Sequence, residues 1–399
     1  MKTLKFAVLI LAMLIINGCT NTEDDFEGNL EQQENAIKEF FGENWRETAP
    51  YITMTLRKEI GDMFAPRALL SLSGSGTAII NWGDGTPNTH VTLSEEIYSN
   101  EVRHVYSKNI GHTVTIIGHN ITFLDCSGNL LTSLDVSKNP ALKELYCFNN
   151  FLTSLDVSNN TELTLLYAKN NRISSLDLSN NRELTFLAVY QNELKSLDLS
   201  NNVALTRLEC GYNNPLSTID LSNNIALEYL DITNFPQDFK AKWGSLDVSN
   251  NPALRILNCS NQGLRELDLS NNPALTYLDC SLNNITNLDL SNNTVLSGLS
   301  CNSNSLTSLN LSNNSALTGL YCDSNRLTSL DLSKNSELIT LYCTNNNLQA
   351  DALNALFNSL PTNNGRIRIA NNPGVTGVGF NQGIAEKKGW KFEYPPYLY

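Results

Sequence analysis

The chain has 399 residues, of which 41% are hydrophobic and 17% charged, and this composition argues against wholesale disorder. The 27 lysines and arginines face 40 aspartates and glutamates, so the net charge is −13, and no basic cluster stands out. Nucleic-acid binding is not expected, because it needs concentrated positive charge. The four histidines lie between His90 and His119, so most of the chain lacks the commonest general base and metal ligand.

The first 19 residues combine two lysines, an apolar run and a cysteine. Lys2 and Lys5 precede eleven consecutive apolar residues, Phe6 to Ile16, which are too few to span a bilayer. The run from Ile16 to Cys19 resembles a bacterial lipobox, in which the cysteine is acylated and becomes the first mature residue. The resemblance implies a signal peptide over residues 1–18 and a membrane anchor at Cys19; an ordinary secretory signal with a chance cysteine is the alternative.

Residues 19–49 form a predicted acidic tether with one short helix near residues 36–41. The acidic run from Thr20 to Glu27 resembles the export tag of some lipoproteins, which implies an outer-membrane lipoprotein exposed on the cell surface. A solvated tether that no receptor recognises would be equally acidic.

Residues 50–119 alternate apolar and polar side chains in short runs separated by glycines, which predicts a small antiparallel β-sandwich. The turn Trp82-Gly83-Asp84-Gly85-Thr86, followed by His104-Val105-Tyr106, resembles a polycystic-kidney-disease-type (PKD) module. That resemblance implies a spacer or interaction domain. We interpret His104 beside Asp84 as a structural histidine rather than as half of a catalytic pair.

From residue 120 to 348 the chain repeats with a period of 21 residues, interrupted by one spacing of 22 and one of 27. The motif Leu-x-x-Leu-x-Leu-x-x-Asn occurs twice in each unit, so each coil is expected to offer two short strands on opposite sides. The units begin at Ile121, Leu142, Leu163, Leu184, Leu205, Leu227, Leu254, Leu275, Leu296, Leu317 and Leu338.

These repeats closely resemble the nested 21-residue (IRREKO-type) class of bacterial leucine-rich repeats and, more distantly, internalins. After Leu348 the template stops, and a helix over residues 350–360, one more strand and Trp390 predict a cap over residues 349–399. The fold expected is therefore mainly β: a solenoid of about eleven coils with a small α/β C-terminal cap, preceded by the sandwich.

Eight cysteines share one inward repeat position, which Ala168, Val189 and Ile232 fill in the other coils. Cysteines in register on parallel strands lie about 4.8 Å apart, which is too far for a disulfide, and no histidine joins them in a zinc site. We predict buried free thiols, at Cys126, Cys147, Cys210, Cys259, Cys280, Cys301, Cys322 and Cys343.

Two polar columns also recur once per coil. Asparagines from Asn139 to Asn335 are predicted to satisfy turn backbone. Aspartates from Asp135 to Asp331, interrupted by Asn310, could invite Ca²⁺, but hydrogen bonds to nearby serines and backbone N–H groups are favoured.

The outward positions vary between coils, so information about a ligand is expected there. They carry many aromatic residues, which we expect to form an exposed aromatic stripe, or else to pack across strands and only stiffen the sheet. The loop of the long sixth unit, with Phe239 and Trp243, is predicted either to reach a partner or to fill a gap in its coil. The candidate ligand-binding residues are Tyr146, Phe148, Tyr167, Phe186, Tyr190, Tyr212, Tyr229, Phe239, Trp243 and Tyr277, and Phe123, Tyr321 and Tyr342 lie at equivalent outward positions.

The functional hypothesis is a lipid-anchored surface protein whose solenoid binds a protein partner, as in adhesion or host contact. Glycan capture is the alternative, because aromatic rings serve both kinds of ligand. Residues 121–348 offer no nucleophile–base pair, cofactor loop or metal constellation, so no enzyme activity, cofactor or metal is predicted.

Overall fold

The computed structural model describes residues 38, 49–57, 67–98, 100–108, 110–212, 214–234 and 243–393. Cys19, Phe239 and, apart from Lys38, the expected helix near residues 36–41 lie outside these described residues. The chain divides into two compact units: residues 1–163 with 170–173, and residues 164–169 with 174–399.

The first unit contains an antiparallel sandwich whose strands alternate buried and solvent-facing residues, as Ile52, Met54 and Leu56 do in β1. One sheet has the order β4-β3-β6-β1-β8, and in the other β2 lies between β5 and β7, with β9 beyond β7. The strands are β1 (Tyr51–Leu56), β2 (Arg67–Ser75), β3 (Thr77–Asn81), β4 (Thr89–Thr92), β5 (Glu101–Val105), β6 (His112–Ile117), β7 (Asn120–Asp125), β8 (Leu131–Asp135) and β9 (Glu144–Tyr146).

The sandwich continues directly into the first coil of the repeats. β7, the first strand of that coil, pairs antiparallel with β2 and parallel with β9. β8, from the other side of the same coil, pairs antiparallel with β1. The two sheets of the sandwich thus cover both sides of the first coil, whose backbone groups would otherwise face water.

The Trp-Gly-Asp-Gly-Thr turn serves the core of the sandwich. The His104 ring stacks on Trp82 at 4.7 Å between centroids, and His104 Nε2 lies 2.7 Å from Asp84 Oδ2. Burial raises the pKa of Asp84, but hydrogen bonds from Thr86 and His104 lower it further, so the net shift is downward. With the histidine held between a buried ring and a carboxylate, the geometry agrees with a structural role.

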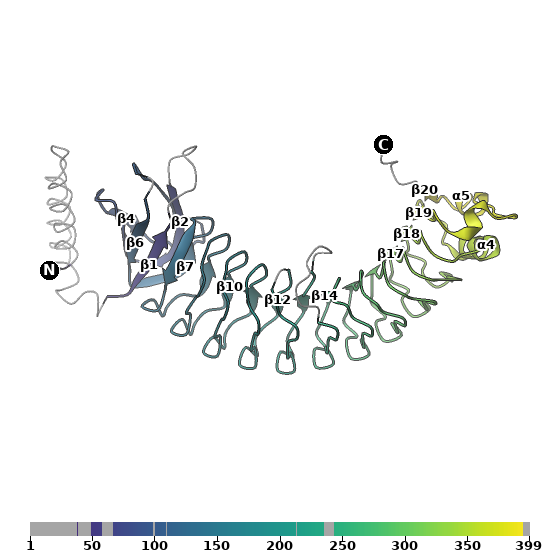
Figure 1. Ribbon diagram of the computed structural model, residues 1–399, viewed down its shortest axis with the longest axis horizontal. Helices are drawn as coiled ribbons and strands as arrows, with labels where there is room; N and C mark the ends of the chain where they lie inside the picture. The colour runs from purple at the N-terminus through teal and green to yellow at the C-terminus, as the bar shows by residue number, and fades with distance from the viewer. Residues whose placement is uncertain are drawn as a thin grey trace. The chain divides into compact units, whose positions relative to one another are not determined.

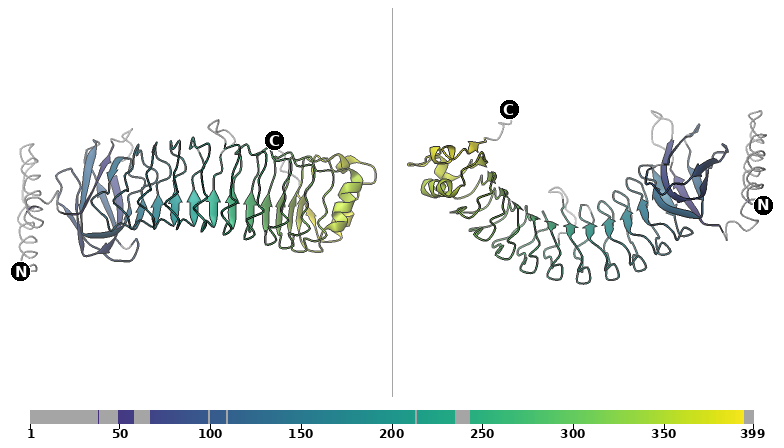
Figure 2. Two further views of the ribbon diagram at one scale, coloured as in Figure 1. Left: turned by 90° about the horizontal axis from the view of Figure 1, so that it is seen from below. Right: turned by 180° about the vertical axis from the view of Figure 1, so that it is seen from behind.

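The second unit is a row of parallel strands, one per coil, each paired with the strand of the next coil (Figure 1). The register is fixed at one repeat, so Leu166 pairs with Leu187, and Leu187 with Leu208. Within this unit the strands line the inner side of a curved row of coils (Figures 1 and 2). They are β10 (Leu165–Tyr167), β11 (Phe186–Ala188), β12 (Arg207–Glu209), β13 (Tyr229–Asp231), β14 (Ile256–Asn258), β15 (Tyr277–Asp279), β16 (Gly298–Ser300), β17 (Gly319–Tyr321) and β18 (Thr340–Tyr342).

The stack extends one turn beyond the predicted eleven coils. β19 (Arg366–Arg368) pairs parallel with β18, and β20 (Lys391–Phe392) pairs with β19. The predicted helix is present as α4 (Ala350–Ser359), which buries Leu353, Leu356 and Phe357. The short helices η1 (Pro373–Thr376) and α5 (Gly383–Glu386) complete the predicted α/β cap.

The prediction of two strands per coil is wrong for the described coils after the first. Only β8 forms on the far side, because it pairs with β1 of the sandwich. In later coils the far segment makes single bonds to the next coil instead of a ladder: Leu264 N–H donates to Asn283 Oδ1 at 3.0 Å, and the Asn284 backbone N–H donates to the Leu264 carbonyl at 2.7 Å. The coils of the second unit also fan apart on this outer side (Figure 1).

The inward positions follow the sequence prediction. The eight repeat cysteines are free thiols with no exposed surface. Asn272 is typical of the buried asparagine column: its amide Nδ2 donates to the carbonyls of Val248 and Asn251 in the preceding coil, at 3.0 and 2.9 Å. These asparagines therefore tie neighbouring coils together as well as forming turns.

The aspartate column is satisfied locally. Asp268 Oδ1 accepts a hydrogen bond from the Ser270 backbone N–H at 2.9 Å, and Asp177, Asp198 and Asp289 repeat this turn at the same distance. Asn310 makes the same bond to Ser312 at 3.1 Å without a charge. The favoured interpretation, local hydrogen bonding, accounts for the column.

Candidate functional site

The outward side chains of the strand face do not form a single aromatic column. The strand register places Phe186, Tyr229 and Tyr277 at the first strand position and Tyr167 at the third. Tyr190 and Tyr212 follow their strands in the next turn. The rings of the second unit are therefore spread over the face and its adjoining turns, where charged side chains lie between them.

In the first unit the aromatic residues pack on each other. Tyr98, from a loop of the sandwich, meets Phe123 edge to face at 5.2 Å and Tyr146 at 6.5 Å. Phe123 is only 2% exposed, so the expectation of an outward Phe123 is wrong: the rings of Tyr98 and Tyr146 pack against it. Phe148 is half-buried.

In the second unit, cations sit over the aromatic rings. Lys169 Nζ lies 4.8 Å from the Tyr167 ring centre and 5.2 Å from that of Tyr190. The Arg207 guanidinium lies 4.0 Å from the Tyr229 ring centre and 5.4 Å from that of Phe186. These contacts hold the rings in place. Both interpretations of the aromatic stripe therefore apply in part, since the same side chains stiffen the sheet and remain partly exposed.

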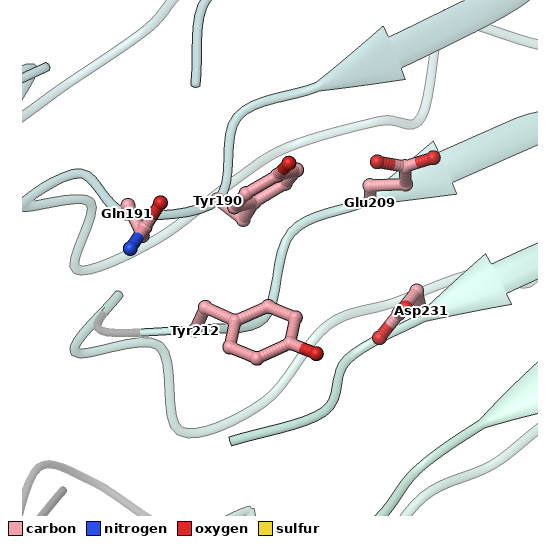
Figure 3. Close-up of a pocket in the computed structure, with 5 residues that line it drawn as sticks. All are labelled: Tyr190, Gln191, Glu209, Tyr212 and Asp231. Carbon is pink, nitrogen blue, oxygen red and sulfur yellow. The ribbon is translucent and has the colours of Figure 1, made fainter. Parts of the chain in front are cut away.

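A pocket of 340 Å³ opens beside this cluster (Figure 3). It is lined by Tyr190, Gln191, Glu209, Tyr212 and Asp231. Glu209 and Asp231 end the adjacent strands β12 and β13, and the hydroxyl ends of both tyrosines point toward these strand ends (Figure 3). Two rings and two carboxylates from neighbouring coils thus line one opening.

The pocket is electronegative. Glu209 Oε1 accepts from Arg207 Nη2 at 2.6 Å, and its side chain is 13% exposed. Asp231 accepts from the Thr233 backbone N–H at 2.9 Å and from Asn258 Nδ2 at 3.3 Å, both neutral donors. Burial and the nearby charge of Asp231 raise the pKa of Tyr212, and burial with Asp231 and Glu209 raises that of Tyr229 to about 12.

The remaining candidate residues have other surroundings. Trp243 is 8% exposed, which does not fit its place among the candidate ligand-binding residues and favours the alternative that it fills a gap in its coil. Tyr277 is 39% exposed on β15. Tyr342 near the cap donates to Glu393 Oε2 at 2.7 Å, while Arg368 lies 4.2 Å from its ring centre, which closes that cluster on itself.

Sequence reasoning missed the charged members of the site, namely Lys169, Arg207, Glu209 and Asp231. A signal was available for Arg207, which the strand register places between Phe186 and Tyr229, and for Lys169, which lies one repeat of 21 residues before Tyr190. Glu209 and Asp231 pair with each other and not with an aromatic residue, so the register gave no such signal for them. Gln191 and Tyr98 gave no such signal, since their positions depend on how turns and loops fold.

Among the described residues, no cluster of His, Cys, Asp and Glu is arranged to hold a metal ion. No helix in that part of the chain is both long and apolar enough to cross a membrane.

No protein-family model and no curated protein matches the sequence. The functional domain of InlJ from Listeria monocytogenes is 33% identical with a TM-score of 0.59, and the match covers 68% of this chain and 59% of that domain. The internalin InlF from the same organism is 21% identical with a TM-score of 0.54, over 69% of this chain and 87% of InlF. A leucine-rich-repeat protein of Leptospira interrogans is 19% identical with a TM-score of 0.54, over 65% and 74%.

The repeats form a leucine-rich-repeat solenoid. The two weaker similarities show this fold alone, whereas the InlJ domain also includes a cysteine ladder, as the present repeats do. The chain spans 59% of the InlJ domain that it matches.

Proposed function

We propose that the chain is a surface protein that binds a protein partner on the strand face of its leucine-rich-repeat solenoid. The observation that carries the proposal is the cluster around the pocket: partly exposed rings, held by cations, beside two carboxylates on adjacent strands. Preordered aromatic residues next to charged groups are typical of the residues that dominate protein interfaces. Similarity to internalins adds to this support.

Triple substitution of Tyr190, Tyr212 and Tyr277 by Ala tests the proposal. The three side chains are at least partly exposed, so removing them should leave the coils folded while partner binding falls by at least about tenfold. Proteins captured by the full chain from candidate contact surfaces are compared before and after the substitution, with circular dichroism to check the fold.

The matched control removes apolar side chains away from the strands. Val203 is 54% exposed and Ile225 is 62% exposed, and both lie in turns between coils. Their substitution by Ala should leave capture unchanged. Equal capture by the tyrosine variant and the wild type would contradict the proposed binding face.

We further propose that Cys19 carries the lipid that anchors the protein at the outer membrane, facing outward. Lys2, Lys5, the apolar run and the lipobox-like residues before Cys19 support this. Metabolic labelling with an alkynyl fatty acid should mark the wild-type protein but not Cys19→Ser. Equal labelling of both would reject the anchor.

A further inference from the structure

We propose that the pocket between Tyr190 and Tyr212 binds a lysine or arginine side chain of the protein partner. The inference rests on the proposed function and adds to it the chemistry of the group recognised. The inference is drawn from the way in which the strand face of the solenoid already binds the side chains of Lys169 and Arg207.

Arg207 shows how this face binds a cation. Its guanidinium lies over the Tyr229 ring at 4.0 Å while its Nη2 donates to Glu209 at 2.6 Å, so one ring and one carboxylate share one cation. Lys169 lies over the rings of Tyr167 and Tyr190 at 4.8 and 5.2 Å. Rings and carboxylates are the groups that attract a cation through the ring face and through charge-assisted hydrogen bonds.

The pocket has the same kinds of group, aromatic rings and a carboxylate, but in the described part of the chain no cationic side chain is paired with Asp231. The Tyr190 and Tyr212 rings lie 5.6 Å apart at 54°, and Asp231 lines the same opening. Within the described part of the chain, no lysine or arginine forms an ion pair with Asp231, and its two hydrogen-bond donors there are neutral. An incoming cation would therefore meet a carboxylate whose charge is not yet balanced.

The cluster near the cap shows the contrast. Glu393 is paired with Arg368 at 3.1 Å and with Arg366 at 3.7 Å, and it accepts from the Tyr342 hydroxyl. That carboxylate is balanced within the fold, whereas Asp231 is not balanced by any described side chain. The pocket volume of 340 Å³ lies near the lower end of the range for ligand sites, about 300–1,000 Å³, which fits one side chain better than a large ligand.

The test measures fluorescence anisotropy of the full chain with two labelled probes, penta-arginine and penta-citrulline, at physiological salt. Citrulline keeps the shape of arginine but lacks its charge. We expect penta-arginine to bind at least about tenfold more tightly, and Asp231→Asn and Tyr212→Ala each to weaken it at least about threefold.

Asp289→Asn is the matched control, because the chain has a net charge of −13 and diffuse attraction of a basic peptide has to be separated from binding in the pocket. Asp289 accepts a backbone N–H two residues on at 2.9 Å, as Asp231 does, but it lies in the aspartate column. Its substitution should leave binding within about 1.5-fold of the wild type. A loss equal to that of Asp231→Asn would show diffuse attraction and overturn the pocket assignment, as would equal binding of the citrulline peptide.

Two further outcomes separate this inference from the proposed function. Loss of the captured partner in the triple tyrosine variant but not in Asp231→Asn would keep the binding face and overturn the cation pocket. Binding of neutral oligosaccharides that Tyr212→Ala abolishes, with no binding of penta-arginine, would assign the pocket to sugars and overturn both proposals.

Discussion

At the scale of single residues, buried asparagines connect neighbouring coils. Asn272 satisfies two carbonyls of the preceding coil and has no exposed surface. Because a buried polar group without a partner costs about 1–3 kcal/mol, Asn272→Ala should lower the free energy of unfolding by about 2–4 kcal/mol. Its exposed neighbour Asn271 is the control, and Asn271→Ala should change stability by less than about 0.5 kcal/mol in denaturant titrations. Equal effects would contradict the role of the buried column.

The cysteine ladder predicts how stability depends on alkaline pH. Burial raises the pKa of Cys301 from 9.0 to about 12, so the thiol stays protonated in the folded protein after it ionises in the unfolded chain. The stability from this group is present below pH 9 and is lost between pH 9 and about 12. Each such thiol contributes a slope of about −1.4 kcal/mol per pH unit in that window.

Cys301→Val should remove one such contribution, since valine already fills this repeat position at Val189. The slope of unfolding free energy against pH between 9.5 and 11 should become about 1.4 kcal/mol per unit shallower. An unchanged slope would contradict the buried thiol. Under denaturing, non-reducing conditions, the eight cysteines of the ladder should titrate as free thiols, and four or fewer would overturn it.

The aspartate column predicts how stability depends on acidic pH. Hydrogen bonds from the serine two residues on lower the pKa of Asp177, Asp198 and Asp268 below 3.8. The stability from these groups is present above pH 3.8 and falls as pH drops through the lowered values. Replacing all three by Asn, which stands at position 310 with the same bond, should remove this contribution, so that the free energy of unfolding falls less steeply below pH 3.8 than in the wild type. An equal slope in wild type and variant would exclude this contribution.

At the scale of elements, the sandwich and the first coil should unfold together. β1 pairs with β8 and β2 pairs with β7, so opening the sandwich exposes the edges of the coil. Ile52→Ala in β1 removes a fully buried side chain and should cost about 2–5 kcal/mol. Hydrogen exchange should then quicken in β8 as well as in β1. Val105→Ala, at a side chain that is 58% exposed in β5, is the control, and unchanged protection of β8 in Ile52→Ala would show two independent units.

The repeat period allowed the inward half of the fold to be predicted from the sequence. Leucines, cysteines and asparagines recur in phase, and their burial follows from stacking alone. The missing far strands could not be predicted, because β8 forms by pairing with β1 of the sandwich, and a Leu-x-x-Leu segment has the same sequence whether or not such a partner strand lies beside it. The strand at β19 was predicted as part of the cap, but its parallel pairing with β18 was not, because this segment lacks the repeat template.

The candidate site was predictable only in part. Aromatic residues at outward positions were visible in the sequence, but which of them share a pocket depends on the register of Glu209 with Asp231 and on the turns that hold Tyr190 and Tyr212. The burial of Phe123 arises from packing by Tyr98, a contact that a repeat pattern does not encode, and the burial of Trp243 lies in the one long unit that departs from that pattern.

At the scale of the whole molecule, we propose that a chain with a net charge of −13 uses its constant repeat positions for stability and its variable positions for recognition. The most direct test of this division is site-specific photo-crosslinking on cells, with benzoylphenylalanine at position 277 on the strand face or at position 225 in a turn. We predict a discrete covalent adduct with a partner protein from position 277 and none from position 225. Adducts only from position 225, or equally from both, would contradict the assignment of the strand face as the binding surface.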